Sequence, residues 1–188
     1  MNSRSGSLHF ESRWSVALAV FGVILLLAIL PNRITLFPTW IIYVVGVAVL
    51  LPIGAVGLTG AKAPWLRVER TVTFLFVLGT GFTTLTNLTN LISGIVGRSP
   101  EISGLQLLAS SVAVWVTTVL IFSMLYWQID RGGPEARMND GSIRPDWLFP
   151  QEEAPVEAVP MGWRPTFIDY LYLGYSTATS FSTTDAVR

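Results

Sequence analysis

Two groups of hydroxyl and amide side chains are the residues of this chain best suited to chemistry. Seven of the nine positions from Ser176 to Thr184 are Ser or Thr, and Asp185 follows them. A second group recurs at steps of three and four in an apolar stretch: Thr80, Thr83, Thr84, Asn87, Asn90 and Ser93. Oxygen atoms of this kind can replace water around a passing ion. The candidates for lining such a path are Asn87, Asn90, Thr179, Ser180, Ser182, Thr183 and Asp185.

The spacing of the second group places Asn87 and Asn90 on one face of a helix. An amide that faced lipid would lack hydrogen-bond partners, so this face is expected to point into a helix bundle. It predicts either a polar path or a set of hydrogen bonds between helices, each worth about 0.6 kcal/mol. The sequence leaves these two interpretations open.

Residues for other kinds of chemistry are missing. The chain has no cysteine, which excludes thiol nucleophiles, thiolate zinc sites and iron–sulfur clusters. Its one histidine, His9, has no partner nearby in the sequence, and no hydrolase, phosphate-loop or dinucleotide motif occurs. The carboxylates of residues 128–165 match no calcium-loop spacing. We therefore expect no enzymatic activity, metal or cofactor, and the formal net charge of zero argues against nucleic-acid binding.

Four apolar stretches must position the polar groups: residues 14–30, 40–58, 71–96 and 105–127. Only 13% of the residues are charged, about half the usual share of roughly 25%. A helix needs about 20 apolar residues to cross a hydrocarbon core of about 30 Å. We predict an all-α, polytopic transmembrane helical bundle with four spans, followed by a C-terminal short helix or re-entrant segment.

Basic residues alternate between the segments that connect the stretches. Nine Lys or Arg residues fall in segments 1–13, 61–70 and 128–165, and two fall in the first and third loops. Short cytoplasmic loops carry an excess of Lys and Arg. This predicts a multi-pass protein of the cell membrane, the bacterial inner membrane, with a cytoplasmic N-terminus. The lipid bilayer is its expected partner, and self-association into a homo-oligomer is left open.

Three regions follow from these patterns: the four-helix transmembrane region 1–127, a polar Pro-rich cytoplasmic loop 128–165, and the C-terminal region 166–188. The sequence from Asp130 to Pro134 is a helix stop, with two glycines before a proline. The loop is interpreted as a solvated, proline-stiffened linker in which Trp147, Leu148 and Phe149 return to the bundle or the headgroups.

The C-terminal region begins with capping-box spacing from Thr166 to Asp169, which predicts a helix start near residue 167. An aromatic first half leads into the hydroxyl-rich stretch, and Ser182 to Asp185 repeats the capping spacing. A short helix, a hydroxyl-rich break and a new helix start are typical of a re-entrant loop. A short interfacial helix with a Ser/Thr-rich tail is the alternative.

Three sequence runs resemble a bacterial family of predicted inner-membrane proteins that is classed as a domain of unknown function. They are WQIDRGGP at 127–134, DWLFPQ at 146–151 and WRPTFIDYLY at 163–172. The resemblance implies location and architecture. It also implies a further hydrophobic span after residue 188, so we expect the chain to be a shortened member or a fragment.

Residues 176–185 are also similar to the pore loop of potassium-type channels, at the end of a pore helix and the filter. Ser182 and Thr184 stand where that filter has glycines, so potassium selectivity is not implied. The predicted function is a channel-like or transport-related membrane protein. The alternative is a non-transporting scaffold or regulatory subunit that docks partners through the 128–165 loop.

Overall fold

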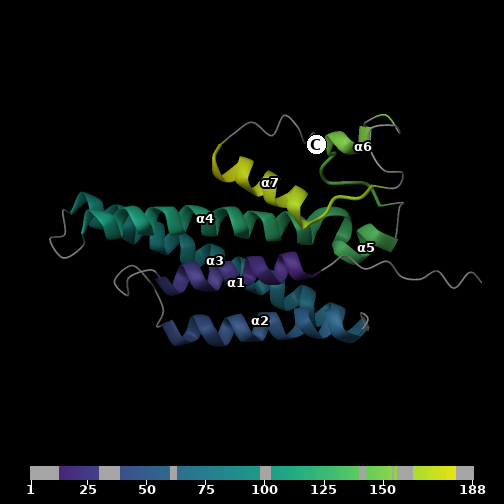
Figure 1. Cartoon of the computed structure of the whole chain (residues 1–188), viewed down its shortest axis with the longest axis horizontal. Helices are drawn as coiled ribbons and strands as arrows, with labels where there is room; N and C mark the ends of the chain where they lie inside the picture. The colour runs from purple at the N-terminus through teal and green to yellow at the C-terminus, as the bar shows by residue number, and fades with distance from the viewer. Residues whose placement is uncertain are drawn as a thin grey trace, which may run out of the picture.

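The computed structural model describes residues 13–29, 39–59, 63–97, 103–139, 143–153, 155 and 163–180. Their secondary structure is helical (Figure 1), which confirms the all-α prediction. The elements in chain order are α1 (Trp14–Ile29), α2 (Thr39–Thr59), α3 (Ala63–Val96), α4 (Gly104–Ile129), the 3-10 turn η1 (Asp130–Gly132), α5 (Pro134–Asn139), α6 (Pro150–Glu153) and α7 (Phe167–Ala178).

Helices α1, α2 and α4 match their predicted apolar stretches to within two residues at each end, whereas α3 begins eight residues before its stretch. Within the described residues, two helical segments are long and apolar enough to cross a membrane, 65–96 and 104–132. The apolar runs of α1 and α2, Trp14–Ala28 and Tyr43–Leu58, are shorter. Length and composition alone therefore support two spans directly.

Local signals fix where the helices begin. At α4, the Gln106 backbone N–H donates to the Ser103 hydroxyl over 3.2 Å, and the Gln106 side chain accepts from the Ser103 N–H over 2.9 Å. At α7, the Asp169 carboxylate accepts from the Thr166 backbone N–H over 2.7 Å. These contacts satisfy amides that lack partners inside a helix. The predicted start of a helix near residue 167 is confirmed.

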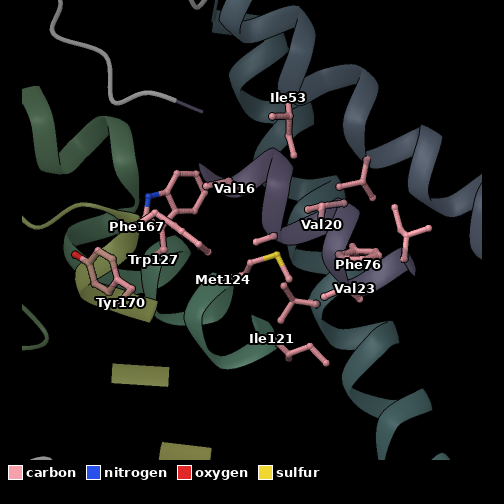
Figure 2. Packing of buried hydrophobic residues seen from close by; sticks show 14 of the residues in the cluster. Val16, Val20, Val23, Ile53, Phe76, Ile121, Met124, Trp127, Phe167 and Tyr170 are labelled. Carbon is pink, nitrogen blue, oxygen red and sulfur yellow. The ribbon is translucent and has the colours of Figure 1, made fainter. Parts of the chain in front are cut away.

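Helix α4 lies at the centre of the packing. It contacts α1 and α3, and α7 packs along it; α2 packs on α1 and α3. In Figure 1, α7 and α2 lie on opposite sides of α4. Figure 2 shows the main core, where Val16, Val20 and Val23 of α1 meet Met124 and Trp127 of α4. Phe167 and Tyr170 of α7 belong to the same core, with Phe167 beside Trp127.

The outward surfaces of the four long helices are apolar. Large hydrophobic side chains are exposed along every one of them, among them Leu18, Phe21, Leu51, Phe82, Leu85, Leu105 and Leu108. Soluble monomers rarely expose continuous apolar surface on this scale. The bundle therefore presents hydrocarbon outward as well as inward.

Candidate functional site

Helix α7 runs back along α4 and ends beside its middle. Tyr170, near its start, reaches Asp130 at the end of α4, whereas the Tyr175 ring lies 6.0 Å from the Trp115 ring, edge to face. Trp115 is close to the midpoint of α4. The Tyr126 and Thr177 hydroxyls share a hydrogen bond of 3.0 Å. The C-terminal end of α7 thus lies at mid-length of the bundle.

The two helices approach each other most closely at Gly174. A Cβ added at this glycine would lie 2.8 Å from the Val119 carbonyl oxygen and 2.8 Å from the Ser123 backbone nitrogen. Real Cβ atoms do not come this close to backbone atoms, so only glycine allows the observed spacing. The chain thereby places α7 directly against α4.

Asp130 anchors the start of α7. Its side chain is fully buried, and the Tyr170 hydroxyl donates to Oδ2. The Asp146 backbone N–H donates to Oδ1 over 3.0 Å, and Arg131 Nε lies 3.5 Å from Oδ2. One carboxylate therefore joins the end of α4, the 143–149 segment and α7. Burial raises the pKa of the Tyr170 phenol. The positive charge of Arg137 opposes this rise, and the hydrogen bond to Asp130 adds to it. The phenol therefore stays protonated and can donate to Asp130.

Arg137 and Arg13 hold the same end of the bundle. Arg137 is buried, donates to the Trp127 carbonyl over 3.1 Å and lies with its guanidinium 4.8 Å from the Tyr170 ring centre. The guanidinium of Arg13 lies 5.2 Å from the Trp127 ring centre. Cations over aromatic faces gain more when water is excluded. These arginines are structural groups buried at this end of the bundle.

Arg13 also links two carboxylates from different helices. Its Nε lies 3.3 Å from Glu69 Oε1 on α3, and its Nη2 lies 3.5 Å from Glu135 Oε1 on α5. Burial raises the pKa of Glu135, and the nearby cations Arg13 and Arg70 oppose that rise. Because Arg13 and Glu69 are buried, removing either one leaves the other charge without compensation.

The backbone reverses direction directly after α4. Arg131, Gly132 and Gly133 all have positive φ, at 54°, 75° and 104°. Gly132 and Gly133 adopt this left-handed backbone conformation without strain, and Arg131 is the non-glycine residue that shares it. The predicted helix stop is confirmed. The turn directs α5 and the 143–153 segment back over the bundle end.

The interpretation of 128–165 as a solvated linker is wrong for the residues that pack on the bundle, although Arg144, Gln151 and Pro155 are exposed. Asp130, Arg131 and Arg137 are buried, Arg131 forms an ion pair with Glu152, and Phe149 belongs to the main core. The predicted return of Trp147 and Phe149 to the bundle is confirmed. Sequence reasoning counted these charges as solvated because their partners lie up to 40 residues away. We call the described residues of this range, 130–139 and 143–153, the cap.

The structure separates the predicted pore-lining residues. Asn87 is buried on α3, and Asn90 is exposed on the same helix. Thr179 follows α7 and donates to the Tyr175 carbonyl over 2.8 Å; Ser180 comes next with a φ of 55°. Among the described elements α7 packs on α4 and touches α1, so Asn87 and Thr179 do not share one lining. Ser182, Thr183 and Asp185 lie outside the described residues.

The polar stripe of α3 lines a cavity. Thr83 donates its hydroxyl to the Gly79 carbonyl over 2.9 Å, within its own helix. Thr80, Thr83 and Asn87 face a cavity of about 350 Å³ between α3, α2 and Leu27 of α1. Both polar atoms of the Asn87 side chain lack a hydrogen-bond partner. Among the described residues, no group of three His, Cys, Asp or Glu side chains is placed to hold a metal ion.

Comparisons with protein-family models, with curated proteins and with solved structures found no match for this chain.

Proposed function

We propose that the chain is a membrane protein that crosses the bilayer four times. Helices α3 and α4 have the length and composition of membrane spans. With 16 and 21 residues, α1 and α2 extend about 24 Å and 32 Å, close to the thickness of the hydrocarbon core. The apolar outward surfaces of all four helices support the same assignment. In this proposal the N-terminus and the cap face the cytoplasm, and the membrane is the bacterial inner membrane.

Within this membrane protein, we propose a channel-like function for α7. The observation that carries it is the position of the helix: α7 starts at the cap and ends beside Trp115, near the middle of α4. An interfacial helix would lie across the bundle end rather than along α4. A helix that ends at mid-depth is tolerated only where it is buried in protein or lines a watery cavity.

The end of α7 is suited to cations. The carbonyl groups of a last helical turn carry a partial negative charge that stabilises a cation. Ser176 and Thr179 each donate a hydroxyl to a carbonyl of their own helix, which leaves the hydroxyl oxygen able to accept or coordinate, whereas the Thr177 oxygen also bonds to the Tyr126 hydroxyl. The face of α7 that points away from Phe167, Tyr170 and Leu173 exposes Ile168, Tyr172 and Tyr175, and Thr179 continues this row one turn later. In lipid, a second copy packed on this face would complete the lining, which favours a homo-oligomer.

The experiment is cation flux into liposomes that contain the purified protein. We expect flux above that of protein-free vesicles, and T179V should reduce it by removing an oxygen at the end of α7. T86V is the matched control, since Thr86 makes the same bond to the carbonyl four residues earlier, on α3. Absence of flux above empty vesicles would reject the channel. Equal losses from both variants would reject α7 as its lining.

The folded cap favours one second candidate, a scaffold that docks partner proteins. A surface held in place by Asp130 and Arg131 keeps its shape without a partner. In native membranes, crosslinking through the exposed residues Arg144 and Gln151 should then capture a defined protein. R144E together with Q151K should abolish that capture while flux stays unchanged. Unaltered capture would reject docking at the cap.

A further inference from the structure

The cavity between α1, α2 and α3 is a candidate binding site that α7 does not share. Its volume of about 350 Å³ lies within the usual range of small-molecule sites, roughly 300–1,000 Å³. Side chains from three helices line it, including Leu27, Val45, Phe76, Gly79, Thr83 and Asn87. Val45 and Leu75 are exposed where it opens outward, so a molecule dissolved in lipid can enter it from the side.

Asn87 is the feature that points to a ligand. Its side chain is 1% exposed, yet its carbonyl oxygen and its amide nitrogen both lack a hydrogen-bond partner. Burying such a group without partners is costly, by about 1–3 kcal/mol. A ligand that offers both a donor and an acceptor satisfies both atoms at once. A hydroxyl group is the smallest that does so.

The distribution of lining residues defines the rest of the ligand. The lining extends along α3 from Val72 to Asn87, about 22 Å of helix. Polar side chains gather toward one end, at Thr80, Thr83 and Asn87, while the other end is aliphatic and aromatic. All twelve lining residues are uncharged, so a charged headgroup would remain uncompensated in a medium of low dielectric constant.

We propose that this cavity binds a neutral single-chain amphiphile whose hydroxyl group bonds to Asn87 and whose hydrocarbon chain lies along α2 and α3. The site is independent of ion conduction by α7. It requires only that α1, α2 and α3 pack as described.

Photoaffinity labelling in liposomes tests the proposal with two probes, a long-chain alcohol and the alkane of equal length, each with a diazirine on the chain. Mass spectrometry then locates the adducts. We expect the alcohol to label lining residues of α2 and α3 several-fold more than the alkane. N87L should lower labelling by the alcohol about 30-fold, the loss of two hydrogen bonds, and N90L should not. Equal labelling by both probes, or equal effects of the two variants, overturns the proposal.

A second pair of variants tests the cavity without changing Asn87. Gly79 lines the cavity and Gly81 does not, and a Cβ at either meets no atom within 4 Å. G79L should fill the cavity and abolish adducts from both probes, whereas G81L should preserve them. Thermal unfolding of each variant establishes that it remains folded. Labelling of the same residues in folded G79L would place the probe elsewhere and overturn the assignment.

Discussion

The contact between α7 and α4 gives a quantitative prediction at Gly174. In G174A, the new methyl group would lie 2.8 Å from two backbone atoms of α4, Val119 O and Ser123 N. Neither atom can turn aside as a side chain does, so the helices must separate. Overpacking of this kind costs about 1–3 kcal/mol. Alanine regains about 0.5–1 kcal/mol of helix propensity relative to glycine. From the middle of each range, the expected net destabilisation is about 1 kcal/mol.

The assay is thermal unfolding in detergent, followed by circular dichroism. For a chain of this size, the expected net change lowers the midpoint by about 2–4 °C. G54A is the matched control: Gly54 lies within α2, and an added Cβ meets no atom within 4 Å. It should leave the midpoint unchanged or raise it slightly. If G174A is as stable as G54A, α7 does not lie against α4. The inference that α7 ends at mid-depth in the membrane would then be refuted.

Three further predictions concern the cap and the orientation. Y170F removes the donor to buried Asp130 and should destabilise the fold by about 1–3 kcal/mol in the same assay, while Y43F, on an exposed face of α2, should change it by less than about 0.5 kcal/mol. The pKa of Glu135 is raised in the folded protein, so the folded state binds this proton more tightly than the unfolded state does. Protonation therefore adds stability at pH values below the usual pKa of 4.5. This added stability is lost as the pH rises through the pKa of Glu135 in the folded protein. E135Q should flatten this part of the curve of unfolding midpoint against pH, and an unchanged slope would show that another group titrates. A reporter enzyme that works only outside the cytoplasm should be inactive when fused within residues 61–70 and active when fused at residue 98; the reverse pattern would refute the cytoplasmic N-terminus.

The sequence predicted those parts of the fold that depend on local patterns. Apolar stretches gave the four long helices to within a few residues at most ends, because hydrophobic runs and capping groups act within one or two turns. The start of α3 at Ala63, eight residues before the predicted stretch, is the largest departure. Its first two turns contain Arg67, Glu69 and Arg70, which hydropathy assigns to a loop although they are compatible with a helix.

Contacts between residues far apart in the chain could not be predicted from the sequence. Nothing in the pattern around Asp130 indicates that Tyr170 would donate to it from 40 residues away. The content of proline and charged residues suggested a solvated linker. In the folded protein, however, buried charged side chains interact with one another instead of with water. For the candidate site, periodicity identified Asn87 correctly as facing inward. Only the packing of α1 and α2 could reveal that it faces a cavity rather than a neighbouring hydrogen-bond partner.

The central place of α4 has a mechanical consequence. This helix touches α1 and α3 on one side and carries α7 on the other, while α7 makes only a small direct contact with α1. Any displacement that starts where α1, α2 and α3 enclose Asn87 therefore reaches the hydroxyl-rich end of α7 mainly as a shift or tilt of α4. Close packing transmits such shifts as rearrangements between discrete states rather than absorbing them. A spectroscopic label on the exposed position Val112 of α4 would report movement on either side of the molecule.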